Sequence, residues 1–178
     1  MGKLEFGGSL NLGKRKSTRP FDSKRPIHIV LRSTKAVGKF SLYHQKFKSH
    51  VNALTFDLAS KHNLRIYNFV NSGNHLHLLL KSKNKSDLQK FFRELTSKIA
   101  LMVYKGLGKF WTSIVYTKLI SWGRQFENVY NYILQNELET WGAIPHQPRG
   151  QGCLEKKSFL ILEKNFQATQ GWRLKGFS

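Results

Sequence analysis

The sequence is poor in cysteine, in acidic residues and in long apolar stretches. Its single cysteine, Cys153, excludes an internal disulfide and any zinc site built from cysteines. The longest apolar run, Leu76 to Leu80, is broken by His77 and is far too short to span a bilayer. The first residues lack the apolar core of a signal peptide. These absences favour a protein of the reducing cytoplasm with no membrane partner.

Acidic residues are scarce beside basic ones. Ten Asp and Glu stand against thirty Lys and Arg, and the formal net charge is +20. So much charge of one sign is self-repelling in a small protein and usually indicates a polyanionic partner. Nucleic acid is the first candidate, and an acidic membrane surface is a second one with little support. We therefore expect a cytoplasmic, nucleoid-associated protein that binds nucleic acid.

The chain divides into three predicted segments. Residues 1–26 form a basic, glycine-rich N-terminal arm that we expect to be poorly ordered, residues 27–144 form one folded domain, and residues 145–178 form a loop and a basic tail. Basic arms commonly follow phosphates or enter a groove of DNA, and a solvated tail is the alternative. The arm residues that we expect to contact DNA are Lys14, Arg15, Lys16, Arg19, Lys24 and Arg25.

Hydrophobic periodicity in the folded domain predicts alternating strands and helices. The predicted strands cover residues 27–32, 64–71, 75–80 and 114–120, with a tight turn at 72–74. The predicted helices cover residues 42–62, the stretch from 86 to the glycine at 106, and residues 125–141. This order predicts an α+β fold of the ferredoxin-like split βαβ type. Its antiparallel central sheet would carry helices on one face, plus an extra C-terminal helix that bears a tyrosine.

His75 and His77 flank Leu76, and this alternation is the spacing of a β-strand. Both imidazoles then project from one face of the strand, while Leu76, Leu78 and Leu80 project from the opposite face into the core. Two histidines on one face of a core strand are costly to bury without partners, and neutral imidazole is a common metal ligand. The pattern therefore indicates a metal site, with a histidine pair held by a carboxylate or a carbonyl as the alternative.

A second pattern lies on the last predicted helix. Four side chains fall within one arc of the helix and should pack on the domain: Phe126, Val129, Tyr130 and Ile133. Tyr132 and Asn136 are four residues apart, so they are neighbours on the flank of that face. From a flank, Tyr132 could act as a nucleophile and Asn136 as an oxygen ligand. On the helix alone, an exposed tyrosine beside an exposed asparagine is the alternative.

The two patterns in this order resemble the single-tyrosine HUH transposases, and most of all the REP-associated tyrosine transposases. The resemblance is carried by residues 74–79 and by Tyr132 with Asn136. Residues 25–32 and 110–112 also fit that family. The similarity extends over roughly residues 14–140.

The resemblance implies roles for the residues that match. His75 and His77 would bind Mg²⁺ or Mn²⁺, and Tyr132 would be the nucleophile. The third metal ligand would follow the tyrosine by four residues, but relatives usually carry a proline directly after it, where this chain has a glutamate. The third ligand therefore stays open among Asn136, Gln135 and Glu137.

By the same resemblance, the chain would be a transposase, a metal-dependent single-stranded DNA endonuclease and strand transferase. It would act on hairpin DNA, folded as a REP-like palindrome, through a 5′-phosphotyrosine intermediate. Monomer and homodimer both stay open. Further residues that we expect to contact DNA are Arg32, Trp122 and Arg124. The alternatives are a catalytically silent nucleic-acid-binding protein of the same fold and, less favoured, an RNA-binding protein of ferredoxin-like fold.

Overall fold

A computed structural model describes residues 4–14 and 17–146 of the chain. Arg15, Lys16 and the predicted tail beyond residue 146 lie outside the described residues. The strands are β1 (Glu5–Phe6), β2 (Ile27–Arg32), β3 (Leu64–Asn71), β4 (His75–Ser82) and β5 (Tyr116–Leu119). The α-helices are α1 (Lys48–Lys61), α2 (Lys85–Tyr104) and α3 (Arg124–Thr140), and two 3₁₀ helices cover Gly8–Asn11 and Gly38–Phe40.

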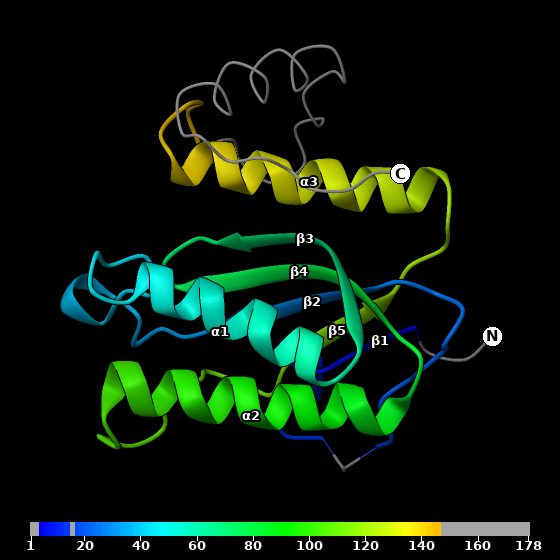
Figure 1. The fold of residues 1–178 in the computed structure, drawn as a ribbon, viewed down its shortest axis with the longest axis horizontal. Coiled ribbons are helices and arrows are strands. Elements are labelled where there is room, and N and C mark those ends of the chain that lie inside the picture. The colour runs from blue at the N-terminus through cyan, green and yellow to red at the C-terminus, as the bar shows by residue number, and fades with distance from the viewer. Residues whose placement is uncertain (1–3, 15–16, 147–178) are drawn as a thin grey trace.

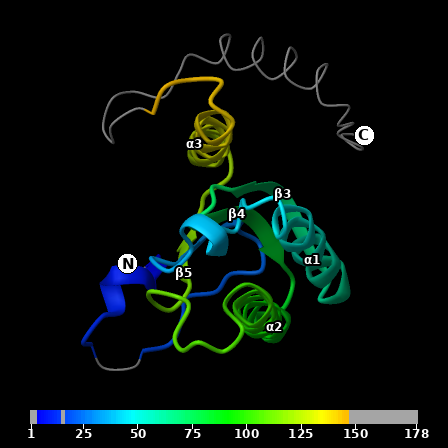
Figure 2. The ribbon, with the colours of Figure 1, turned by 90° about the vertical axis from the view of Figure 1, so that its left-hand side faces the viewer.

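The strands form one sheet in the order β1-β5-β2-β4-β3, and each neighbouring pair is antiparallel. Helices α1 and α2 cover one face of this sheet, and α3 lies across the opposite face (Figures 1 and 2). The predicted α+β architecture, with an extra tyrosine-bearing helix, is therefore confirmed. Strand β4 lies between β2 and β3, so the histidine strand is a central one.

Alternate residues of β4 serve the two faces of the sheet. Leu76, Leu78 and Leu80 are fully buried in the large core under α1 and α2. Leu79 points the other way, into a small cluster of buried residues under α3. The alternation of β4 thus decides which face carries the histidines, as the sequence pattern predicts.

The turn before β4 fixes where that strand starts. Gly73 has a φ of 84°, and a Cβ at this position would lie 3.0 Å from the Ser41 hydroxyl oxygen, so glycine suits the turn. The Gly73 N–H donates to the Asn71 side-chain oxygen at 3.1 Å, and the Leu42 N–H donates to the Gly73 carbonyl at 2.7 Å. These bonds hold the start of β4, and with it His75, against the segment before α1.

Several predicted boundaries shift by one or two residues, and two segments differ more. The helix predicted from residue 42 begins at Lys48, because Leu42 bonds to the β3–β4 turn and Phe47 closes a turn onto His44 instead. The arm predicted to be poorly ordered contains β1, which pairs with β5, and the 3₁₀ helix Gly8–Asn11. That prediction is wrong for these residues, because an edge strand can add to the sheet through backbone bonds that composition does not reveal.

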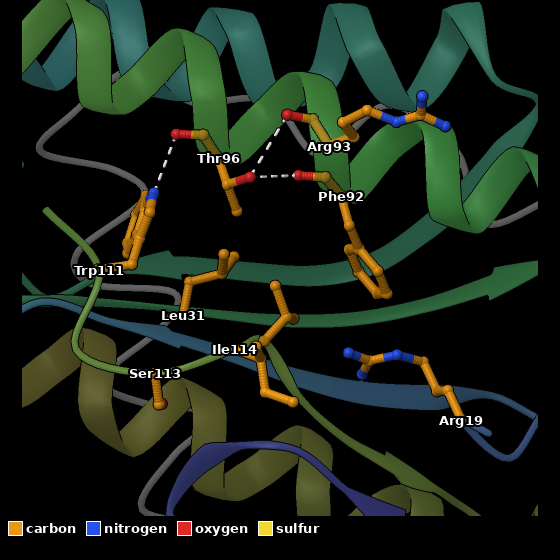
Figure 3. A pocket seen from close by; sticks show the side chains of 9 residues that line it. Arg19, Leu31, Phe92, Arg93, Thr96, Trp111, Ser113 and Ile114 are labelled. Carbon is orange, nitrogen blue, oxygen red and sulfur yellow. Dashed lines mark hydrogen bonds between the residues drawn. The ribbon is translucent and has the colours of Figure 1, made fainter. Parts of the chain in front are cut away.

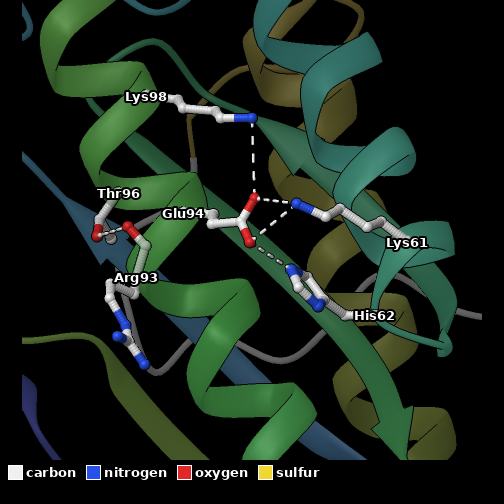
Figure 4. Close-up of polar contacts among 6 residues, drawn as sticks. All are labelled: Lys61, His62, Arg93, Glu94, Thr96 and Lys98. Carbon is white, nitrogen blue, oxygen red and sulfur yellow. Dashed lines mark hydrogen bonds and ion pairs between the residues drawn. The ribbon is translucent and has the colours of Figure 1, made fainter.

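A polar cluster joins α1 to α2 on the outer side of the two helices (Figure 4). The Glu94 carboxylate of α2 lies 2.8 Å from Lys61 Nζ and 3.0 Å from His62 Nε2, both at the end of α1. The Lys61 bond is the main cause that lowers the pKa of Glu94. Among the described residues, none of the helices is long and apolar enough to cross a membrane.

Candidate active site

Three histidines from two neighbouring strands project from the sheet face that α3 covers. On β4, His77 lies opposite Val30 of β2, and His75 lies opposite Arg32. His28 precedes Val30 by two residues, so it shares the face of His77. The exposed fraction is 7% for His28 and 3% for His77, whereas His75 is only half-buried. The site therefore opens toward His75.

The three rings are in contact. The His75 and His77 ring centroids lie 4.7 Å apart with the planes at 83°, and the His28 and His77 rings are nearly parallel, at 9°, with centroids 5.5 Å apart. A hydrogen bond of 3.3 Å joins His28 Nε2 to His77 Nδ1. Burial, and then the charge of Lys118, lower the pKa of His28 to about 4, so His28 is neutral at pH 7.

The ring of Tyr132, on α3, contacts two of these histidines. It lies edge-on to His77 at 5.5 Å and edge-on to His28 at 6.2 Å. The side chain is still 38% exposed, so a strand of DNA can reach it. The structure thus brings together the tyrosine and the histidine pair that the sequence analysis selected from segments far apart in the chain.

Helix α3 is seated by contacts with β3 and β4. Ile133 is buried against Val70 and Leu79, and Phe126, Val129 and Tyr130 pack on this small cluster as predicted. Asn68 donates its side-chain amide to the Tyr130 carbonyl at 3.3 Å. A β-bulge between Ile66 and Asn68 turns Asn68 toward α3. Simple alternation would place Asn68 on the face of Ile66, and the bulge is what puts it on the opposite face.

The ring nitrogens of the histidine pair fit metal binding. Asn74 Oδ1 can only accept a hydrogen bond, so the His75 Nδ1 that contacts it carries the proton. His77 Nδ1 also forms a hydrogen bond, to His28 Nε2. The Nε2 atoms would then be the atoms that could bind a metal, as is common when Nδ1 bonds to a neighbour. This donor set suits a divalent ion that accepts nitrogen and oxygen ligands.

The residues considered for a third ligand are consecutive on α3. The Asn136 amide group donates to the Tyr132 carbonyl at 2.7 Å, which leaves the Asn136 side-chain oxygen as its possible ligand atom. Gln135 donates instead to Glu139 at 3.1 Å. Across the described residues, no three His, Cys, Asp or Glu side chains form a metal-binding group. The choice of a third ligand among Asn136, Gln135 and Glu137 therefore stays a prediction.

Strand β5 adds a polar rim beside His28. Tyr116 lies edge-on to His28 at 6.4 Å, and Lys118 forms an ion pair of 2.6 Å with Glu5 of β1. Burial, followed by the Glu5 carboxylate, raises the pKa of Tyr116 to about 12. Tyr116 therefore stays protonated in the physiological range and is a poorer nucleophile than an exposed tyrosine.

The predicted DNA-contacting residues fall in different places. Arg32 is exposed beside His75, and Arg124 is exposed at the start of α3. Trp122 is 49% exposed, with Lys81 Nζ 5.6 Å from its ring, and its indole N–H donates to the Lys24 carbonyl at 2.8 Å. Their role in binding DNA therefore stays a prediction.

Two arginines of the N-terminal arm are held by the domain itself. Arg25 donates to the Ile120 carbonyl at 3.3 Å and to the Ser121 hydroxyl at 2.9 Å.

Arg19 donates to the Thr117 hydroxyl at 2.6 Å and lies 4.6 Å from the Phe6 ring centroid. It lines a cavity of about 300 Å³ between α2 and the segment before β5 (Figure 3). Burial lowers the pKa of Arg19 to about 10. Arg19 thus lies on the sheet face opposite Tyr132, whereas Lys14 and Lys24 are exposed.

His28 is the member of the group that the sequence analysis did not single out as a site residue. It occupies an ordinary position in an alternating strand, and only the pairing of β2 with β4 brings it to His77. The sequence does contain one signal for it: a histidine among apolar residues on a buried strand needs a polar partner.

Comparisons with known proteins identify the family and a structure of the same fold. A family model described as "Transposase IS200 like" matches residues 23–136. A solved structure of a REP-associated tyrosine transposase bound to a REP hairpin has 13% sequence identity, covers 70% of this chain and 73% of its own, and has a TM-score of 0.58. A second structure, a candidate transposase from Deinococcus radiodurans R1, has 13% identity, covers 69% and 98%, and has a TM-score of 0.42. None of the curated proteins compared with the sequence matches it.

Proposed function

The chain belongs to the IS200-like transposase family, and from this premise we propose that it cuts and rejoins single-stranded DNA hairpins with Tyr132 as its nucleophile. The family assignment and the fold of the REP-associated neighbour confirm the resemblance predicted from the sequence. That neighbour is bound to a REP hairpin, which supports a DNA hairpin as the partner here.

One observation carries the proposal: the Tyr132 ring lies 5.5 Å from His77, which is in contact with His75. A tyrosine hydroxyl has an ordinary pKa near 10, so it is protonated and weakly nucleophilic at neutral pH. It needs a centre of positive charge close by to stabilise its phenolate. A Mg²⁺ or Mn²⁺ ion held by the histidine pair would supply that charge and polarise the scissile phosphate.

The reaction would run as two in-line displacements at phosphorus. In the first, the Tyr132 oxygen attacks the scissile phosphate, the bond to the 3′ oxygen breaks, and the phenol proton is lost as the leaving oxygen gains one. The products are a 5′-phosphotyrosine and a free 3′ hydroxyl. In the second, a 3′ hydroxyl attacks the same phosphorus and Tyr132 leaves. The energy of the phosphodiester is kept in the covalent link, so strand transfer needs no nucleotide cofactor.

The residues around the site would hold the DNA strand. Arg32, opposite His75 on β2, is suited to the phosphates next to the scissile one. Trp122 presents a half-exposed ring on which an unpaired base can stack, with Lys81 beside it. Tyr132 and Trp122 are both partly exposed, so an unpaired strand could reach them, which agrees with a cleavage site outside the paired stem of a hairpin.

The test is formation of a covalent adduct. The protein is incubated with an end-labelled DNA hairpin carrying a single-stranded flank and with Mn²⁺, and the products are separated on a denaturing gel. We expect an adduct that Tyr132→Phe abolishes and Tyr130→Phe keeps. Tyr130 is a matched control because it lies two residues away on the packing face of α3.

The other outcomes have defined meanings. Tight DNA binding without an adduct, on hairpins with varied flanks, would favour the catalytically silent DNA-binding protein. An adduct that survives His75→Ala at full rate would contradict the metal site. An adduct that survives Tyr132→Phe would move the nucleophile to another residue.

A further inference from the structure

His28 is buried in the site although it belongs to neither sequence pattern. Its ring is nearly parallel to that of His77 and is joined to it by a 3.3 Å hydrogen bond, and it contacts the Tyr132 ring edge-on at 6.2 Å. His28 therefore touches both His77 and Tyr132. A side chain in that place can control how both are oriented.

The hydrogen bond between the two rings contains a single proton. If His28 Nε2 carries it, His77 Nδ1 is the acceptor, and the other nitrogen of His77 is protonated and unable to bind a metal. If His77 Nδ1 carries it, His28 is the acceptor, and His77 Nε2 keeps its lone pair for a ligand. Only the second arrangement is compatible with the proposed site.

The neighbouring histidine shows the same device. Asn74 Oδ1 accepts from His75 Nδ1, which directs the lone pair of His75 to Nε2. An asparagine oxygen on one ring and an imidazole nitrogen on the other would thus select the same tautomer in both members of the pair. Partners of this kind commonly orient metal-bound histidines.

We propose that His28 is a positioning residue, which accepts the Nδ1 proton of His77 and so presents His77 Nε2 to the metal beside Tyr132. The proposal rests on the proposed function for its purpose, but the hydrogen bond that it describes can be measured in the protein without metal or DNA. His28 does not itself touch the substrate in this arrangement.

Two substitutions separate hydrogen bonding from packing. His28→Gln can place an amide oxygen near the position of Nε2 and keep an acceptor for His77. His28→Leu keeps an apolar side chain at the position but removes the acceptor. His62→Leu is the matched control, because His62 is also 7% exposed and bonds to Glu94 between α1 and α2, outside the site.

The first measurement is the long-range ¹H–¹⁵N NMR spectrum of the histidine rings in the full chain, without metal. We expect the Nδ1-protonated form of His77 in the wild type and in His28→Gln, and a shift toward the Nε2-protonated form in His28→Leu. An Nε2-protonated His77 in the wild type would overturn the proposal. This NMR measurement does not depend on enzymatic activity, so its result is valid even if the proposed function is wrong.

The second measurement is the affinity for Mn²⁺ alone, followed by the loss of the free-ion electron paramagnetic resonance signal. We expect His28→Leu to weaken binding about 10- to 100-fold, with His28→Gln and His62→Leu near the wild type. Equal affinity of His28→Leu and wild type would contradict the positioning role. A wild type that binds no Mn²⁺ and forms no adduct would instead refute the proposed function. If His28→Leu does not fold, the wild-type spectrum and His28→Gln still decide.

Discussion

On strand β4, three leucines face helices α1 and α2, whereas two histidines face helix α3. The first face closes over a core of twenty-one buried residues, and the second covers a cluster of only four. The histidine face also carries polar groups from β2 and β5, and it leaves Tyr132 partly open to solvent.

We infer that one face of the sheet stabilises the fold and that the other carries the candidate active site. Burial of apolar area supplies most of the favourable free energy of folding, and the α1/α2 face contains most of that area. The α3 face can then carry three histidines and a tyrosine, whose burial costs free energy, without loss of the fold. The following substitutions test whether stability and chemistry are separated in this way.

The largest effect should come from Tyr132→Phe. Removal of the attacking oxygen should lower the rate of adduct formation by at least about a thousandfold. The melting temperature should stay close to that of the wild type, because the side chain is 38% exposed. Gel assays and thermal unfolding on the same samples measure both quantities. A large drop in melting temperature would mean that the tyrosine supports the fold as well.

The next effect compares two adjacent leucines of β4 that are both fully buried, Leu78 and Leu79. Each substitution by alanine should cost about 2–5 kcal/mol of unfolding free energy. We expect Leu78→Ala at the upper end, since its core is large and continuous, and Leu79→Ala at the lower end, since α3 can shift to fill the space. Urea unfolding gives both values. Equal losses would contradict the distinction between the faces.

A smaller effect is expected for Arg32→Ala at the open side of the site. Loss of one phosphate contact should reduce the slope of log affinity against log salt by about 0.7 for single-stranded DNA. Lys98→Ala, which removes an exposed charge on α2, is the control and should leave the slope nearly unchanged. Fluorescence anisotropy with a labelled strand at several salt concentrations measures the difference. Equal changes for both variants would indicate binding by net charge alone.

The smallest effect should come from Glu94→Gln, on the helix pair that is far from the chemistry. The pKa of Glu94 is lowered in the folded protein, so the charged carboxylate stabilises the fold above its ordinary value of 4.5. The stability difference between variant and wild type should therefore be present at pH 7 and disappear as the pH falls through the lowered pKa. Thermal unfolding across this range tests it, with adduct formation unchanged at pH 7.

Much of the fold could be predicted from local pattern. Strands β2 and β3 have the predicted bounds, because alternation and the turn at residues 72–74 are local signals. The early start expected for α1 was wrong, and so was the poor order expected for the part of the arm that contains β1 and the 3₁₀ helix Gly8–Asn11. Both errors concern segments whose backbone bonds go to distant residues, such as Leu42 to Gly73 and β1 to β5.

The site could be predicted only in part, because local patterns reveal some of its residues but not those that depend on distant contacts. His75 and His77 share a face because they are two residues apart on a strand. Tyr132 lies on a helix flank because of its position relative to the apolar residues of α3. His28 and Asn68 escaped notice because their importance depends on the pairing of β2 with β4 and on a bulge in β3. Neither feature has a signature within a few residues.

By itself, the sequence determined the two periodicities that separate a leucine face from a histidine face and that place Tyr132 beside a packing stripe. These follow from the geometry of a single strand and a single helix, which needs no information from elsewhere in the chain. Only the tertiary structure decided that α3 lies over the histidine face, and that His28 joins His77 beneath Tyr132. Such contacts depend on strand register and on helix seating, which many weak interactions across the whole domain select together.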